Sequence, residues 1–315
     1  MGHVRRKGYG EPAAHVLMAK PPAGSASVPR MDWLQDSFTR SVLLPLLTAF
    51  AAVGAIRLFW GPSRGAAVAS AATPAGFILA FASLGVSVVP PGRGSLGIVV
   101  YIALAGLIVG AILDSEGIRD GARRTIVMAL GLAGVAWVGW PPAFGLPAIR
   151  DSDILIALVV ATLLVGYRIT RLSGSASTVP IQLMVASLGL AGIAWAGASN
   201  ELALIGVALA SATFAFVLWN WPVYRFPPGA ALVAGIGAPI SALGTYTVLF
   251  THSSRLALGT LLLVFFSEWL AGGIYLGSGK LGLALRPIIT TLAALLVAAV
   301  ATLIAYVRGG STFPF

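Results

Sequence analysis

The residues able to do chemistry in this sequence are few, and most are arginines and carboxylates that interrupt long apolar runs. Asp114, Glu116 and Asp120 stand close together between two such runs, and Arg123 follows them. Carboxylates are the ligands that Mg²⁺ takes from proteins, usually one or two beside water and phosphate oxygens. Arginine holds phosphate through paired N–H donors without a metal. These residue types could therefore bind phosphate, through the arginine alone or with a metal ion held by the carboxylates.

The other cationic candidates share this placement at the ends of apolar runs. They are Arg64, Arg168, Arg171 and Arg225. The predicted phosphate-binding set consists of these four arginines, Arg123, the polar Asn220 and the flexible Gly229. A plainer alternative stays open, because cytoplasmic connections of membrane proteins retain arginine for topology alone. The carboxylates could likewise be ordinary loop charges paired with neighbouring arginines, and Asn220 could simply cap and anchor a helix.

Glu268 differs from these residues because it stands inside an apolar run, ten or so positions from its start. An ionisable side chain within a membrane span is costly and by default suggests a function. We interpret Glu268 as a catalytic or supporting residue. The alternative is a protonated carboxyl group, or one hydrogen-bonded to Trp269 or to a neighbouring helix.

Composition decides what kind of scaffold must position these residues. Hydrophobic residues make up 58% of the 315 positions and charged residues only 10%, whereas soluble domains are near a quarter charged. A water-soluble fold of this size could not bury so much apolar surface. In lipid, backbone groups must pair internally, and the long continuous runs indicate helices rather than barrel strands. The net charge of +10 is scattered singly, which does not favour nucleic-acid binding.

The apolar runs predict an all-α, polytopic transmembrane bundle of about ten helices with no soluble domain. We expect residues 1–40 to be a disordered tail and translation to start within it, at Met31. One transmembrane domain follows over 41–307, and a short tail over 308–315. The ten predicted spans are 41–59, 66–89, 95–113, 124–142, 153–167, 180–198, 201–219, 229–250, 256–276 and 287–307.

The distribution of Lys and Arg predicts the sidedness of these spans. The connections after the odd-numbered spans hold ten of these cations, and the opposite connections with the carboxy-terminal tail hold four. The excess places the odd-numbered connections in the cytoplasm, with both termini outside. The basic amino-terminal tail opposes this orientation.

The connection after the seventh predicted span carries the most specific motif. It reads Trp219-Asn220-Trp221-Pro222-Val223-Tyr224-Arg225, and Gly229-Ala230-Ala231 follow. This string resembles W-N-F-P-P-A-R-I-F-M-G-D-A-G-S of the polyprenyl-phosphate N-acetylhexosamine-1-phosphate transferases. That family includes the phospho-N-acetylmuramoyl-pentapeptide and undecaprenyl-phosphate N-acetylglucosamine-1-phosphate transferases. Asn220, Pro222, Arg225 and Gly229 match the pattern, while Ala230 replaces its aspartate.

Weaker matches follow the other odd-numbered spans and extend the resemblance over most of 43–307. Asp114 matches the first aspartate of the family's L-D-D-x-x-G-L, with Ser115 at the second, and Arg64 matches P-x-P-R-G-G-G. Arg168 and Arg171 keep the i, i+3 spacing of the family's N-x-x-N but replace both asparagines. Glu268 stands where the family also has an acidic residue, and the connection after the ninth span lacks the family's histidines.

The resemblance implies ten or eleven helices in the inner (plasma) membrane of a bacterium and an active site on cytoplasmic loops, with Asp114 as a catalytic residue and metal ligand. It also implies Mg²⁺-dependent transfer of a sugar-1-phosphate from a UDP-sugar to a polyprenyl phosphate in cell-envelope glycan synthesis. The replaced carboxylates argue against that reaction here, since Ser115 and Ala230 cannot serve as ligands and the arginines repel a metal ion. Three hypotheses therefore stay open: a divergent transferase, a non-catalytic relative that binds polyprenyl phosphate, and a ten-helix metabolite transporter of the drug/metabolite type. A homodimer is compatible with each.

Overall fold

The computed structural model describes residues 36–86, 96–115, 118–145, 152–172, 177–222, 224–272 and 280–309. Side chains are not described at 60–67, 140–145, 152, 280, 281 and 283. The chain divides into two units, Met1–Asp32 and Trp33–Phe315. The first unit, which holds most of the predicted tail, lies outside the described residues, whereas residues 39 and 40 already belong to the first helical segment.

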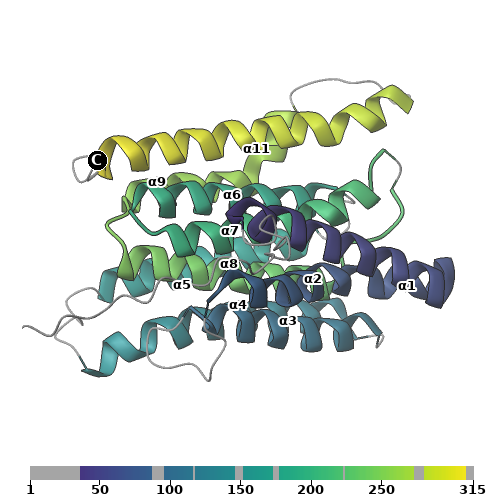
Figure 1. Cartoon of the computed structure of the whole chain (residues 1–315), viewed down its shortest axis with the longest axis horizontal. Coiled ribbons are helices and arrows are strands. Elements are labelled where there is room, and N and C mark those ends of the chain that lie inside the picture. The colour runs from purple at the N-terminus through teal and green to yellow at the C-terminus, as the bar shows by residue number, and fades with distance from the viewer. Residues whose placement is uncertain are drawn as a thin grey trace, which may run out of the picture. The chain divides into compact units, whose positions relative to one another are not determined.

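The described residues are mostly helical and include no strand, which confirms the all-α prediction. Short π- or 3-10-helical turns at Thr39–Leu43, Ala69–Ala71, Ala82–Leu84 and Leu262–Phe266 connect or interrupt the α-helices. The α-helices, shown in Figure 1, are α1 (Leu44–Val68), α2 (Ala72–Phe81), α3 (Ile98–Ser115), α4 (Asp120–Gly145), α5 (Ser152–Leu172), α6 (Thr178–Ala196), α7 (Asn200–Trp219), α8 (Ala230–Phe250), α9 (Arg255–Leu261), α10 (Ser267–Gly272) and α11 (Lys280–Gly309).

Among the described residues, nine helical segments are long and apolar enough to cross a membrane, and Ala69–Leu84 is a shorter apolar tenth. The prediction of about ten membrane helices is therefore confirmed by length and composition. The fifth predicted span was too short, since α5 continues past Arg168 and Arg171 to Leu172. The ninth is interrupted, because 3-10 geometry over Leu262–Phe266 separates α9 from α10.

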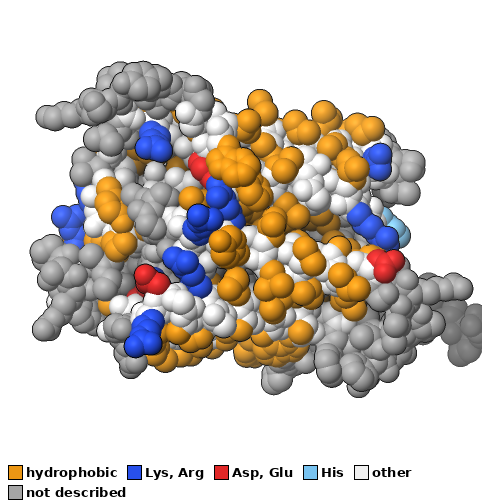
Figure 2. All heavy atoms as spheres, turned by 180° about the vertical axis from the view of Figure 1, so that it is seen from behind, with side chains coloured by type: hydrophobic (Ala, Val, Ile, Leu, Met, Phe, Trp, Pro, Cys, Tyr) orange, Lys and Arg blue, Asp and Glu red, His pale blue; other side chains and the backbone are white. Residues whose placement is uncertain are grey.

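The outward faces of the helices are apolar, as lipid requires. On α11, large exposed side chains recur every three or four residues, at Ile288, Leu292, Leu296, Val300, Leu303 and Val307. The opposite face of α11 packs its alanines against α6, where a Cβ on Gly189 would lie 3.1 Å from the Cβ of Ala298. Figure 2 shows charged side chains in two zones, with hydrophobic side chains across the surface between them. This is the surface of a multi-pass membrane protein.

Close packing of α3 against α8 positions the residues considered next. Gly106, Gly110 and Asp114 follow one another at four-residue intervals and therefore share one face of α3. A Cβ on Gly106 would lie 2.5 Å from the carbonyl oxygen of Ala234, and one on Gly110 would collide with Ala231. The two glycines let the α8 backbone approach closely, as small residues do between membrane helices. The next position on this face, Asp114, consequently meets the start of α8.

Candidate functional site

Described residues at or next to the ends of α3, α5, α7 and α10, together with Ser70 after α1, contact one another at one end of the bundle. Ser70 contacts Asp114 at the end of α3, and Asp114 contacts the start of α8. The end of α5 contacts the segment that leads into α10, and Trp221 donates to the carbonyl of Ala284 near the start of α11. The described helix ends beside the odd-numbered connections therefore lie close together, and the side of the membrane that they face stays a prediction.

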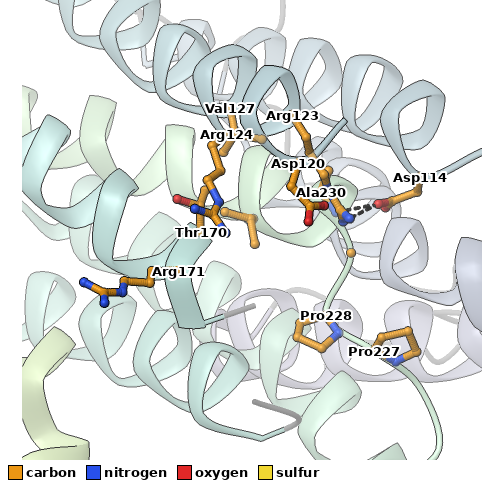
Figure 3. Close-up of a pocket in the computed structure, with 12 residues that line it drawn as sticks. Asp114, Asp120, Arg123, Arg124, Val127, Thr170, Arg171, Pro227, Pro228 and Ala230 are labelled. Atoms are coloured by element: carbon orange, nitrogen blue, oxygen red, sulfur yellow. Dashed lines mark hydrogen bonds and ion pairs between the residues drawn. The ribbon is translucent and has the colours of Figure 1, made fainter. Parts of the chain in front are cut away.

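A pocket of about 520 Å³ opens at this end between α4, α5 and the residues preceding α8. Its polar lining is Asp114, Asp120, Arg123, Arg124, Thr170 and Arg171, and Gly229 and Ala230 border it through the backbone. Figure 3 shows Asp114 and Arg171 on opposite sides of the space. Four residues of the predicted site thus line one pocket: Asp114, Arg123, Arg171 and Gly229.

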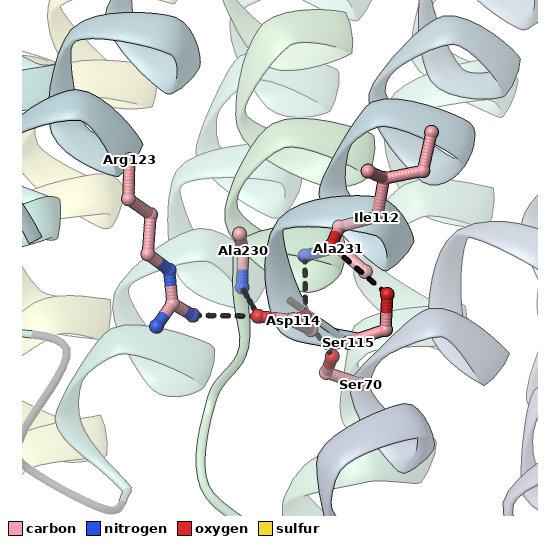
Figure 4. Close-up of polar contacts among 7 residues, drawn as sticks. All are labelled: Ser70, Ile112, Asp114, Ser115, Arg123, Ala230 and Ala231. Carbon is pink, nitrogen blue, oxygen red and sulfur yellow. Dashed lines mark hydrogen bonds and ion pairs between the residues drawn. The ribbon is translucent and has the colours of Figure 1, made fainter. Parts of the chain in front are cut away.

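Asp114 is the most heavily bonded side chain of this pocket (Figure 4). One carboxylate oxygen accepts from Arg123 Nη2 and from the N–H of Ala230, both at 2.7 Å. The other accepts from the N–H of Ala231 at 3.0 Å and from Ser70 Oγ at 3.1 Å. Only 5% of the side chain is exposed. Asp114 therefore caps α8 from another helix, where a negative charge favours the unpaired N–H groups and the helix dipole.

The donors around Asp114 do not fit Mg²⁺. Each carboxylate oxygen already accepts two hydrogen bonds, one of them from Arg123 or Ser70 and one from the α8 backbone. A metal ion would have to displace these donors and would meet the guanidinium of Arg123 at contact distance. Ala230 has no side-chain oxygen that could bind a metal ion, and its backbone N–H donates to Asp114. Within the described part of the chain, no group of three His, Cys, Asp or Glu side chains could hold a metal.

Gly229 is explained by the same contacts. A Cβ at this position would collide with the carboxylate of Asp114 and the hydroxyl of Ser70. Gly229 precedes α8 with extended backbone geometry. Its role in the structure is to leave room for Asp114 at the start of the helix.

Asn220 and Arg225 do not line the pocket, although both were predicted to belong to it. Asn220 is buried, and its Oδ1 accepts from the N–H groups of Arg225 at 3.0 Å and Phe226 at 2.8 Å. This side chain therefore folds the connection after α7, which contains a cis peptide bond between Trp221 and Pro222. The Arg225 side chain is exposed. Partial burial raises the pKa of the neighbouring Tyr224, so its phenol stays neutral.

Arg168 and Glu268 form a second polar cluster with Gln182, outside the pocket. Arg168 Nη2 forms an ion pair with Glu268 Oε1, and Gln182 Nε2 donates to Glu268 Oε2 at 2.6 Å. The Arg168 guanidinium also lies over the rings of Phe266 and Trp269, at 5.2 and 5.1 Å. In this structure the Arg168 guanidinium is paired with Glu268 and does not line the pocket, so its predicted binding of phosphate stays a prediction.

Glu268 lies thirteen positions after Arg255, where the helical stretch begins, as predicted. Gly272, four residues further on, is the last described residue of that stretch. The contact between Glu268 and Gln182 was not predicted. Gln182 could have been noticed in the same way as Glu268, because it is a polar residue within the apolar run 180–198. Ser70 gave no comparable signal. Arg64 belongs to α1, but its side chain is not described, and Glu116 lies outside the described residues.

No protein-family model and no curated protein matches this chain. Its residues and their geometry therefore carry the functional assignment.

Proposed function

We propose that this protein binds a polyprenyl phosphate or a closely related lipid phosphate at the pocket and does not catalyse sugar-phosphate transfer. In this reading it is a non-catalytic relative of the polyprenyl-phosphate N-acetylhexosamine-1-phosphate transferases in the inner membrane of a bacterium, with the pocket facing the cytoplasm. The observation that carries the proposal is the state of Asp114. Its carboxylate is saturated by Arg123 and the α8 backbone, so the pocket retains cations and loses its candidate metal ligand.

Charge at the pocket favours an anion. Once Asp114 and Arg123 neutralise each other, Arg124 and Arg171 remain against Asp120. Neither of these two arginines forms an ion pair with a described carboxylate, and both are exposed. Guanidinium groups bind phosphate oxygens through paired donors. The proposed role of Arg124 and Arg171 is to hold the phosphate from α4 and α5.

An apolar groove supports a lipid as the bearer of this phosphate. The groove has a volume of about 400 Å³ and lies between α5, α6, α8 and α9, with Leu158, Ala161, Val165 and Phe265 among its lining residues. Hydrocarbon is the ligand that such a lining favours. The groove borders the same helix, α5, that supplies Arg171 to the pocket.

Helix packing does not favour the transporter hypothesis. Two inverted five-helix repeats would make each helix contact recur five helices further on. Here α4 packs against α8, whereas the corresponding pair of α9 and α3 shows no comparable packing in the described residues. Likewise α1 packs against α7, but α2 and α6 show no comparable contact in these parts of the chain.

The test is binding to the purified protein in lipid nanodiscs, followed by native mass spectrometry. Undecaprenyl phosphate should bind, and undecaprenol, which lacks the phosphate, should bind at least tenfold more weakly. Arg171→Gln should weaken binding about tenfold, since a charge-assisted hydrogen bond contributes about 1.5 kcal/mol or more. Arg286→Gln is the matched control, because this arginine is exposed on α11 near the same end of the bundle but does not line the pocket.

Two outcomes would overturn the proposal. Equal binding of undecaprenyl phosphate and undecaprenol would remove the phosphate from recognition. Mg²⁺-dependent release of UMP from a UDP-sugar in the presence of undecaprenyl phosphate would establish the transferase alternative.

A further inference from the structure

Arg168 stands at the junction between the apolar groove and the cationic pocket. On α5 it follows Val165, which lines the groove, by one helical turn and precedes Arg171, which lines the pocket, by another. Its Nε donates to the carbonyl of Phe265 at 3.5 Å, and Phe265 also lines the groove. A lipid phosphate that used both sites would have to pass this arginine.

The Arg168–Glu268 ion pair lies beside this junction, although neither residue lines the groove or the pocket. It ties α5 to the segment that contains Phe265, Phe266 and Trp269, and the two aromatic rings of Phe266 and Trp269 lie against the guanidinium. The two charged side chains are only 17% and 19% exposed. Two opposite charges with little solvent contact attract each other more strongly than a surface pair does. Separating them is costly unless another charged group takes the place of the lost partner.

Side chains, not helix packing, join α10 to α5 and α6. The described residues of α10 pack against α11 and the preceding 3-10 turn, and they show no comparable packing against α5, α6 or α8. The described links from α10 to α5 and α6 are the contacts of Glu268 with Arg168 and Gln182 and of the Trp269 ring with Arg168. In the described structure, Gln182 Oε1 and Ser267 Oγ are buried without a hydrogen-bond partner. This arrangement thus leaves two buried polar groups without hydrogen bonds. Such a cost is compatible with a second conformation in which these groups find partners.

We propose that the Arg168–Glu268 ion pair is a releasable closure between groove and pocket. An incoming phosphate replaces Glu268 as the partner of Arg168, and α10 then moves away from α5 so that the hydrocarbon chain enters the groove. A phosphate carries more negative charge than a carboxylate and offers more acceptor oxygens to the guanidinium. This inference rests on the proposed lipid-phosphate binding, but the role of Glu268 in holding α10 can be measured without any ligand.

The experiment is a distance measurement between α5 and α10. The chain has no cysteine, so Leu164→Cys and Leu270→Cys, both at exposed positions, give one spin-labelled pair for double electron–electron resonance in nanodiscs. Glu268→Gln should lengthen or broaden the distance distribution without ligand, and undecaprenyl phosphate should do so with Glu268 intact. Glu201→Gln, at an exposed carboxylate on α7, should change nothing.

Each result decides a separate point. An unchanged distribution in Glu268→Gln would overturn the closure, and so would bound undecaprenyl phosphate, detected by native mass spectrometry, without any change in distance. Failure of undecaprenyl phosphate to bind at all would instead overturn the proposed function and, with it, release by phosphate. Glu268→Gln should also raise the affinity for undecaprenyl phosphate about threefold or more, because the competing carboxylate is gone. Should this variant not fold, Glu268→Asp, which keeps the charge on a shorter side chain, is expected to broaden the same distribution.

Discussion

Replacing Asp114 tests whether this carboxylate is a helix cap or a metal ligand. Asp114→Asn keeps the shape of the side chain but replaces one acceptor oxygen by an NH₂ donor. In one orientation the NH₂ group faces the donors Arg123 and Ala230 N–H, and in the other it faces Ser70 and Ala231 N–H. At least one N–H of the α8 terminus then loses its acceptor. The structural role predicts a loss of stability whether or not a metal is added.

The magnitude follows from the contacts. A buried donor left without its partner costs about 1–3 kcal/mol, and an N-cap substitution costs about 0.5–2 kcal/mol. The ion pair with Arg123 adds little because the Arg123 side chain is 31% exposed. We expect Asp114→Asn to destabilise the protein by about 2 kcal/mol and Asp114→Ala by about 3 kcal/mol. At about 2–4 °C per kcal/mol, the Tm of Asp114→Ala should fall by about 6 °C or more.

The assay is thermal unfolding in detergent followed by tryptophan fluorescence, with Asp120→Asn as the control. Asp120 lines the same pocket but is exposed, so its substitution should change stability by less than about 0.5 kcal/mol. The double variant with Arg123→Gln should lose less than the sum of the single variants, because the two residues interact. A Tm of Asp114→Asn within 1 °C (roughly 0.5 kcal/mol) of the unaltered protein would refute the capping role. Destabilisation only in the presence of Mg²⁺ would instead make Asp114 a metal ligand.

Two further substitutions test how the connection before α8 is built. Gly229→Ala should lower stability by about 2 kcal/mol in the same unfolding assay, because its Cβ collides with buried polar atoms. Gly244→Ala is the control and should be neutral or stabilising, since a Cβ there would meet no atom within 4 Å. Equal effects of the two substitutions on stability would contradict the collision. Asn220→Ala should cost about 2 kcal/mol, since two backbone N–H groups lose their acceptor, and limited proteolysis should cut the connection sooner; unchanged proteolysis would show that Asn220 does not fold it.

The helices could be predicted from the sequence because lipid imposes a simple rule on it. The predicted spans 201–219 and 229–250 differ by one residue from α7 and α8, since apolar runs bounded by polar connections locate helices well. The rule failed at α5, where Arg168 was taken as the end of the span. Arginine can continue a membrane helix when it has a partner, and Glu268 provides it.

The candidate site could be predicted only in part, because residue types do not reveal which groups satisfy each other. The sequence correctly brings Asp114, Arg123 and Gly229 together. It could not show that Asp114 is saturated, since half of its donors are backbone N–H groups of α8, which no side-chain pattern records. The contact between Gln182 and Glu268 joins residues 86 positions apart, and such pairings depend on tertiary packing.

The side chain at position 230, at the start of α8, decides whether the pocket has a second carboxylate beside Asp114. An aspartate at position 230 would place a second carboxylate beside Asp114, and two such charges remain close only when a cation lies between them. With Ala230 there is no second carboxylate, and the partners of Asp114 are the N–H groups of Ala230 and Ala231 with Arg123 and Ser70. The pocket lining holds three arginines against two aspartates. Such a lining favours the proposed phosphate over a metal ion, because the arginines repel a cation.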